Sequence, residues 1–177
     1  MTDFIARTIA LRKKYPVLRE TRFLYGDREV LPGLYDVSWF DERGNALTIE
    51  AWQDPEGRAL TLRRAGPGLN GEIDVILLMF NAFAQSLAFT PPAPHLEWNV
   101  LLDSAEPNAV EHPLVGGAEL EVAAHSIVVL LAQPTGDADW QAVWMAGPYQ
   151  GPRLLTALPP DPGTMVPHRP PEIDQTQ

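Results

Sequence analysis

The spacing of short apolar segments between residues 72 and 132 most strongly limits how this chain can fold. Apolar and β-branched residues gather in five segments, at 73–82, 86–90, 97–102, 120–123 and 126–132, which Pro, Gly, Asn or Asp residues separate. No stretch with helical periodicity alternates with them. Parallel strands need a long crossover, usually a helix, so the pattern predicts a mainly β fold, an antiparallel β-sandwich over 72–132.

The alternation within these segments also predicts which side chains form the core, because residues i and i+2 of a strand point to the same face. A shift of one residue would exchange the two faces. The predicted core set is Ile76, Leu78, Phe80, Phe89, Trp98, Val100, Leu102, Ile127, Val129 and Leu131.

The first residues of the chain predict an amphipathic helix. Thr2 and Asp3 are suitable capping residues, positive charge gathers at 12–14, and Pro16 ends the pattern. Its apolar stripe contains Phe4, Ile5, Ile9 and Leu11. Because isolated helices of this length are marginal in water, we expect the chain to fold this helix onto its own sandwich, to dimerise through it, or to leave the stripe loosely ordered.

Two further regions complete the expected organisation. Residues 27–71 alternate short apolar clusters with Pro and Gly turns, which indicates an irregular connecting region with short strands and one helical turn capped by Thr48. Residues 133–177 hold half of the 18 prolines, and we expect a short helix at 137–145 followed by a Pro-rich, partly disordered tail.

Charge and composition exclude several classes of partner. Residues 1–30 carry seven basic and four acidic side chains, whereas the remainder carries six basic and 19 acidic ones. Such a field repels phosphate chains, and the longest apolar runs, 75–80 and 127–132, are far shorter than the roughly 20 residues that span a bilayer. We therefore expect no nucleic-acid or membrane partner. Without cysteine or a recognisable leader, the chain is expected in the cytoplasm.

The sequence offers no catalytic motif, and we predict no cofactor and no metal site, since the four histidines lack metal-ligand spacing. Five aspartates stand beside turn signals or strand ends, which favours solvated turn roles over catalysis. They are Asp36, Asp41, Asp54, Asp74 and Asp103. Trp39 and Trp52 lie in the irregular region, where flat rings can stack on sugars, and are the candidate glucan contacts. Trp98 lies in a strand and is assigned to the core.

Several runs in order resemble the C-terminal part of the isoamylase-type glycogen debranching enzymes of the α-amylase superfamily. Residues 9–19 and 22–26 look like the last helix of that family's catalytic barrel, and 36–39, 44, 47–48, 52 and 58–60 look like its post-barrel insertion. Residues 76–82, 89–92, 98, 101–105 and 125–130 look like its C-terminal β-sandwich. Tyr15 and Phe83 depart from the family pattern, which commonly has His at both positions.

The resemblance implies that intact family members hydrolyse α-1,6 branch linkages in glycogen, with α-glucan as the ligand. It also implies that the catalytic carboxylates belong to barrel strands upstream of residues 1–26, so this chain is predicted to be non-catalytic alone. The implied partner is a barrel domain, or a second copy bound through the N-terminal helix. Two alternatives are a free-standing glucan-binding module and a subunit that completes a separately encoded barrel.

Overall fold

The computed structural model describes residues 2–21, 23–114 and 119–134. A 13-residue helix and a short 3₁₀ helix precede a series of antiparallel strands, which a second, five-residue helix interrupts. The elements are α1 (Thr2–Lys14), η1 (Pro16–Arg19), β1 (Glu29–Leu31), β2 (Leu34–Tyr35), β3 (Val37–Phe40), α2 (Ile49–Gln53), β4 (Ala59–Pro67), β5 (Ile73–Asn81), β6 (Leu87–Phe89), β7 (Asn99–Asp103), β8 (His112–Pro113), β9 (Leu120–Val122) and β10 (Ser126–Ala132).

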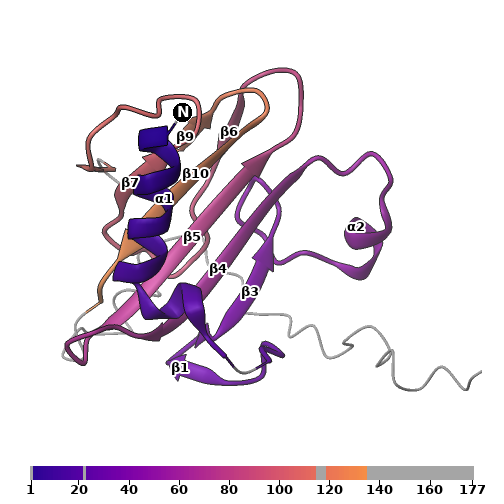
Figure 1. Cartoon of the computed structure of the whole chain (residues 1–177). Coiled ribbons are helices and arrows are strands. Elements are labelled where there is room, and N and C mark those ends of the chain that lie inside the picture. The colour runs from indigo at the N-terminus through magenta and orange to yellow at the C-terminus, as the bar shows by residue number, and fades with distance from the viewer. Residues whose placement is uncertain (1, 22, 115–118, 135–177) are drawn as a thin grey trace, which may run out of the picture.

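A six-stranded antiparallel sheet forms the centre of the structure, with the strand order β3-β4-β5-β10-β7-β8. The longest pairing joins β4 to β5 as a hairpin, and β10 then pairs with the other edge of β5. Figure 1 shows α1 lying across the β10 and β7 side of this sheet. We call the side that carries α1 the helix face and the opposite side the core face.

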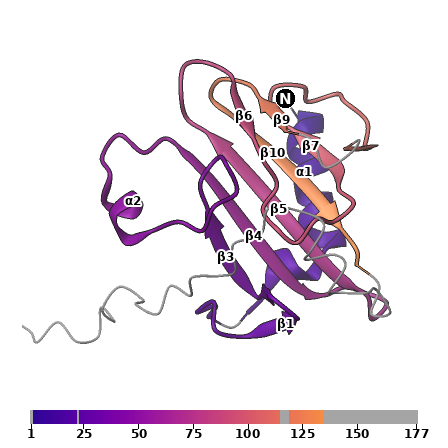
Figure 2. The same ribbon diagram turned by 180° about the vertical axis from the view of Figure 1, so that it is seen from behind.

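The core face carries the main hydrophobic core. Side chains of β5, β10 and β7 pack there against residues from β2, β6, β9 and the segment before β7, which form a thinner second layer that includes the two-stranded sheets β1-β2 and β6-β9 (Figure 2). Its buried members are Leu34, Ala65, Val75, Leu77, Met79, Phe89, Trp98, Val100, Val122, Val128, Leu130 and Ala132. The two layers confirm the predicted antiparallel β-sandwich.

The helix face carries a second, smaller core. Phe4 and Leu11 of α1 pack against it, together with Tyr15 and Val17, which are buried. The sheet residues beneath them are Ile76, Leu101, Leu102, Val129 and Leu131. The Arg7 guanidinium donates hydrogen bonds to the carbonyls of Pro107 and Ala109, in the loop after β7, and fixes one flank of the helix. The stripe of α1 is therefore partly covered by the chain's own sheet.

The observed strands agree closely with the predicted ones between residues 72 and 132. β5, β6, β7, β9 and β10 lie within two residues of the expected bounds at each end, and β10 matches them. The sheet is larger than the predicted sandwich, because β3 and β4 of the expected connecting region belong to it. The predicted limit at residue 72 thus falls within the β4-β5 hairpin. The helix expected at 137–145 and the Pro-rich tail lie outside the described residues.

The predicted core set needs a correction along β5 and β10. Ile76 and Val129 are buried, but in the smaller core on the helix face, while Ile127 is 37% exposed. The other register of β5, with Leu77 at its middle, forms the sandwich core. The cause is that both faces of the sheet are apolar and both are at least partly covered, so alternation alone does not identify the sandwich side. Phe89 and Trp98 lie in the main core as predicted.

Candidate functional site

The two predicted glucan contacts lie together at one edge of the sheet. Trp39 projects from β3 on the helix face, and Trp52 comes from α2, which stands out from the loop between β3 and β4 (Figure 1). Their ring centroids are 5.2 Å apart and the ring planes meet at 74°, an edge-to-face contact. Trp52 is 49% exposed, so a ring remains available to a ligand.

Local hydrogen bonds form α2 and hold it in place. The Thr48 hydroxyl oxygen accepts from the Ala51 backbone N–H, which confirms the predicted cap. The pKa of the Glu50 carboxyl is lowered by hydrogen bonds from its own backbone N–H and from the Thr48 side chain. The negative form of Glu50 is therefore favoured in the first turn of α2.

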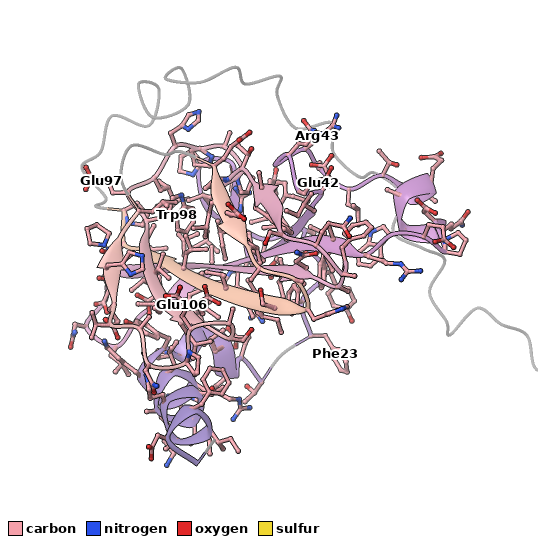
Figure 3. All side chains as sticks on the ribbon, turned by 90° about the horizontal axis from the view of Figure 1, so that it is seen from above. Phe23, Glu42, Arg43, Glu97, Trp98 and Glu106 are labelled. Carbon is pink, nitrogen blue, oxygen red and sulfur yellow. The ribbon has the colours of Figure 1, made fainter. Side chains whose placement is uncertain are left out.

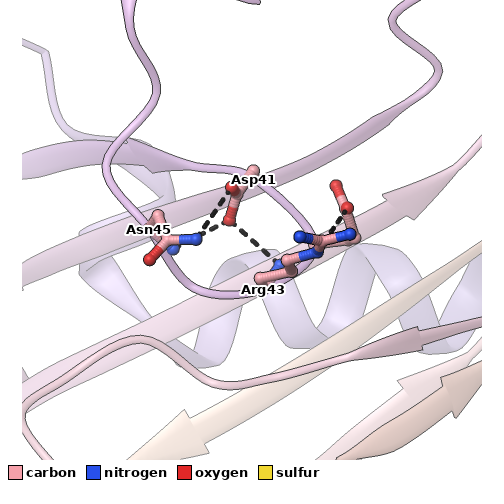
Figure 4. Close-up of polar contacts among 4 residues, drawn as sticks. Asp41, Arg43 and Asn45 are labelled. Atoms are coloured by element: carbon pink, nitrogen blue, oxygen red, sulfur yellow. Dashed lines mark hydrogen bonds and ion pairs between the residues drawn. The ribbon is translucent and has the colours of Figure 1, made fainter. Parts of the chain in front are cut away.

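The turn that follows Trp39 is fixed by Asp41. One oxygen of its carboxylate accepts the backbone N–H groups of Arg43 and Asn45, and the other accepts from the Asn45 side-chain amide (Figure 4). The Leu47 N–H then donates to the carbonyl of Trp39, which returns the chain to the edge of β3. Both oxygens of Asp41 thus hold the turn that supports the aromatic pair.

Gly44 brings this turn against the rest of the molecule. It has a φ of +78°, which favours glycine, and an added Cβ would lie 2.9 Å from the carbonyl oxygen of Thr90. The Thr90 N–H donates to the carbonyl of Glu42 in the same turn. These contacts attach the turn that follows Trp39 to the second layer of the sandwich.

The sequence analysis missed one apolar residue of this site. Ile49 is 42% exposed and lies three positions before Trp52, a spacing that places both on one side of a helical turn. That spacing is the signal that would have identified Ile49. In the turn after β3, Glu42 and Arg43 form an ion pair at 3.5 Å.

The arrangement suits a neutral, hydroxyl-rich ligand. An exposed indole ring offers a flat apolar surface on which a sugar ring can stack. Trp98 differs, since it is 3% exposed in the main core, as predicted, while its neighbour Glu97 points outward (Figure 3). Among the described residues, no three His, Asp or Glu side chains group closely enough to hold a metal ion.

The predicted turn aspartates divide into two groups. The carboxylates of Asp41, Asp54 and Asp103 each accept a backbone N–H two residues further along the chain, as turn residues do. Asp36 and Asp74 are only 1% exposed, so the prediction that they are solvated was wrong. Asp36 lies between β2 and β3, and Asp74 lies within β5, so both belong to the sheet region rather than to exposed turns.

Asp74 is a buried carboxyl of β5. Burial raises the pKa of Asp74, and a 2.8 Å hydrogen bond from the Gln133 amide opposes this in part. The nearby negative charge of Glu72 raises the pKa further, while Lys14 lowers it. Because the pKa of Asp74 is raised, its charged form is disfavoured at this buried position, and Asp74 lies outside the aromatic site.

The fold and the site together define a class, an antiparallel β-sandwich domain with a supported aromatic pair at one edge. The chain belongs to the isoamylase C-terminal domain family, whose model matches residues 36–131. It is 27% identical over 107 residues to the isoamylases of Pseudomonas amyloderamosa and of Pseudomonas sp. strain SMP1. The match covers 59% of this chain and 13% of each relative, so the chain corresponds to a small part of those proteins.

The matched segment begins at Asp36 and ends at Leu131, and it therefore includes β3 and β4 together with the strands between 72 and 132. Both tryptophans of the site fall inside it. Within the part of the chain that the structure describes, no helix combines the length and apolarity needed to cross a membrane.

Proposed function

We propose that this chain is the accessory C-terminal portion of an enzyme that hydrolyses α-1,6 branch linkages in an α-glucan such as glycogen. In this proposal the sandwich contacts the glucan through Trp39 and Trp52 and does not cleave it. The observation that carries the proposal is the edge-to-face tryptophan pair, with Trp52 49% exposed and Trp39 half-buried, on a domain of the isoamylase C-terminal family.

The position of α1 supports a role within a larger enzyme. If α1 is the last helix of a catalytic barrel, the helix face of the sheet is the side that meets that barrel. Part of this face is covered by α1 and part is not, since Ile127 of β10 is 37% exposed, and Ile5 and Ile9 of α1 itself are also exposed. The curated relatives are much longer than the segment they share with this chain, which leaves room for a barrel in them.

The first prediction concerns the glucan contact. Trp52→Ala removes the exposed ring, and we expect the apparent dissociation constant for glycogen to rise at least about tenfold, which corresponds to about 1.4 kcal/mol of lost apolar contact. Affinity electrophoresis in gels that contain glycogen measures this constant.

Phe23→Ala is the matched control, because Phe23 is an aromatic residue that is 85% exposed and projects from another segment (Figure 3). Its migration in glycogen gels should equal that of the wild type. A Trp52→Ala protein that is folded and retarded as strongly as the wild type would show that the tryptophan pair does not contact glucan.

The second prediction is that the purified chain releases no reducing ends from branched glucan. Glycoside hydrolysis uses two carboxyl groups held across the scissile bond, and no such pair could be assigned from the sequence. A reducing-sugar assay after prolonged incubation with glycogen, with a buffer blank, checks the result. Activity that persists through a second purification step would contradict the proposal.

The tryptophan pair with its exposed Trp52 ring also favours a second candidate, a free-standing glucan-binding module. A third is a subunit that completes a separately supplied barrel. Adding a barrel protein that lacks this region distinguishes them, because a subunit restores debranching activity to the mixture whereas a module binds glucan without doing so.

A further inference from the structure

The turn between β4 and β5 contains Asn70 followed by Gly71, the one Asn-Gly pair in the sequence. In such a pair the backbone nitrogen of the glycine can attack the side-chain carbonyl carbon of the asparagine, because glycine has no Cβ to hinder the approach. The reaction needs an exposed asparagine, a free backbone N–H on the next residue and open space around it. The structure of this turn meets all three conditions.

Both reacting groups are accessible. Asn70 and Gly71 are exposed, and an added Cβ on Gly71 would meet no heavy atom within 4 Å outside its chain neighbours. In the described part of the chain, neither the Gly71 N–H nor the Asn70 side-chain amide makes a hydrogen bond. The bonds that close the turn join other groups, from the Gly68 N–H to the Glu72 carbonyl and from the Asn70 N–H to the Glu72 carboxylate.

The other asparagines of the chain lack this combination, since each is followed by a residue with a side chain. Asn81 is buried, and its amide nitrogen donates to three carbonyls. Asn45 is exposed in the turn after β3, but its amide donates to Asp41 and Ala46 follows it. Asn70 is therefore the asparagine at which sequence and structure both favour reaction.

We propose that Asn70 is a site of spontaneous covalent modification, where attack by the Gly71 nitrogen converts the asparagine to aspartate and isoaspartate. A bond forms between the Gly71 nitrogen and the Asn70 Cγ, and the bond from Cγ to Nδ2 breaks. The Nδ2 group leaves as ammonia, with the proton from the Gly71 N–H. Water then opens the cyclic imide at either of its two carbonyl carbons, which gives aspartate from one opening and isoaspartate from the other.

The modification adds a negative charge to a turn that already holds two carboxylates. Those of Glu72 and Asp74 meet above Gly68, since an added Cβ there would lie 2.7 Å from the Glu72 Cδ and 2.9 Å from the Asp74 Oδ2. Asp74 is 1% exposed, and its pKa is already raised by burial and by the charge of Glu72. A further carboxylate at position 70 disfavours the charged form of Asp74 still more, because like charges repel.

This modification goes beyond the proposed function and is separate from it. The β4-β5 turn follows the end of β4, whereas α2 with Trp52 precedes its start (Figure 1). Modified and unmodified chains should therefore be retarded equally in the glycogen gels. A chain that binds no glycogen should still react at Asn70, and a chain that does not react at Asn70 leaves the proposed glucan contact intact.

Peptide mapping of the aged full chain tests the proposal. Cleavage after glutamate places Asn70 in the peptide 57–72, which contains no other asparagine. After incubation of the folded chain at mildly alkaline pH, we expect conversion at Asn70 to be at least about tenfold faster than at Asn45, the matched internal control. Mass spectrometry measures both conversions, and chromatography separates the aspartate and isoaspartate forms of the peptide.

The free synthetic peptide 57–72 gives the rate of the same reaction without the fold. A folded chain that stays unmodified at Asn70 for as long as this peptide needs to convert completely would overturn the proposal. Equal rates at Asn70 and Asn45 would overturn it as well, since the glycine and the free N–H would then have no effect.

Asn70→Asp tests the effect of the added charge. At neutral pH its urea midpoint should lie below that of the wild type, and the difference should shrink on acidification as the carboxylates of the turn become protonated. Asn99→Asp adds the same charge at an exposed position of β7 and should change the midpoint less. A midpoint for Asn70→Asp equal to that of the wild type at neutral pH would overturn the inferred coupling to Glu72 and Asp74.

Discussion

Asn81→Asp is expected to lower the free energy of unfolding by about 3 to 5 kcal/mol. Asn81 is 2% exposed at the end of β5, and its side-chain amide nitrogen donates to the carbonyls of Gln85, Val122 and Ala123. Its side-chain oxygen accepts the N–H of Phe83. An aspartate would keep the last of these bonds but would turn a carboxylate toward three carbonyl oxygens, with no donor between them.

Urea denaturation followed by circular dichroism measures this effect as a shift of the midpoint. Asn99→Asp is the matched control, because it makes the same chemical change at an exposed position of β7, and its effect should be within about 0.5 kcal/mol. Equal midpoints for the two variants would show that the Asn81 amide does not hold the β5-β6 connection and the end of β9 together.

The strands that the sequence predicted well are those with local signals. β5 and β10 are apolar runs with clear breaks at both ends, and Thr48 precedes a short helix in the usual capping position. β4 was missed as a long strand because its sequence contains two arginines and a Gly-Pro pair, which read as a polar turn region. Sequence patterns report local preference, and these strands are recognisable from it.

Long-range contacts explain why β4 is nevertheless a central strand. Arg63 is 4% exposed on the core face, where its guanidinium donates to the carbonyl of Ala93 and lies 4.7 Å from the ring centroid of Phe40. A buried arginine needs such partners, and they come from a segment 30 residues away and from the neighbouring strand. No pattern within the sequence of β4 predicts these partners.

The candidate site was likewise predicted from the sequence only in its individual residues and not in their contacts. Trp39 and Trp52 were identified singly, from residue type and from their place in an irregular region. Their contact depends on the Asp41 turn and on the close approach of Gly44 to Thr90, which join segments far apart in the chain. Ile49 could have been added from its helical spacing, whereas the edge-to-face geometry required the folded structure.

The two faces of the sheet differ in how completely they are covered, and two adjacent leucines of β5 test this difference. Leu77 is fully buried in the main core, while Leu78 points to the helix face and is only partly buried against the smaller core. Leu77→Ala should lower the free energy of unfolding by about 3 kcal/mol, because it leaves a cavity among close-packed side chains. Leu78→Ala should cost roughly 1 kcal/mol, since water already reaches that position and less apolar contact is lost.

Each leucine is the matched control for the other, as residue type, strand and substitution are the same. Urea denaturation followed by circular dichroism measures both variants under the same conditions. A larger cost for Leu78→Ala than for Leu77→Ala would mean that the main core lies on the helix face, as the alternation of Ile76, Leu78 and Phe80 predicts from sequence alone. The smaller cost is expected at Leu78 because a second layer of strands covers β5 on the core face, whereas the helix face is only partly covered. The sheet is therefore one layer of a sandwich on its core face and a partly open surface on its helix face.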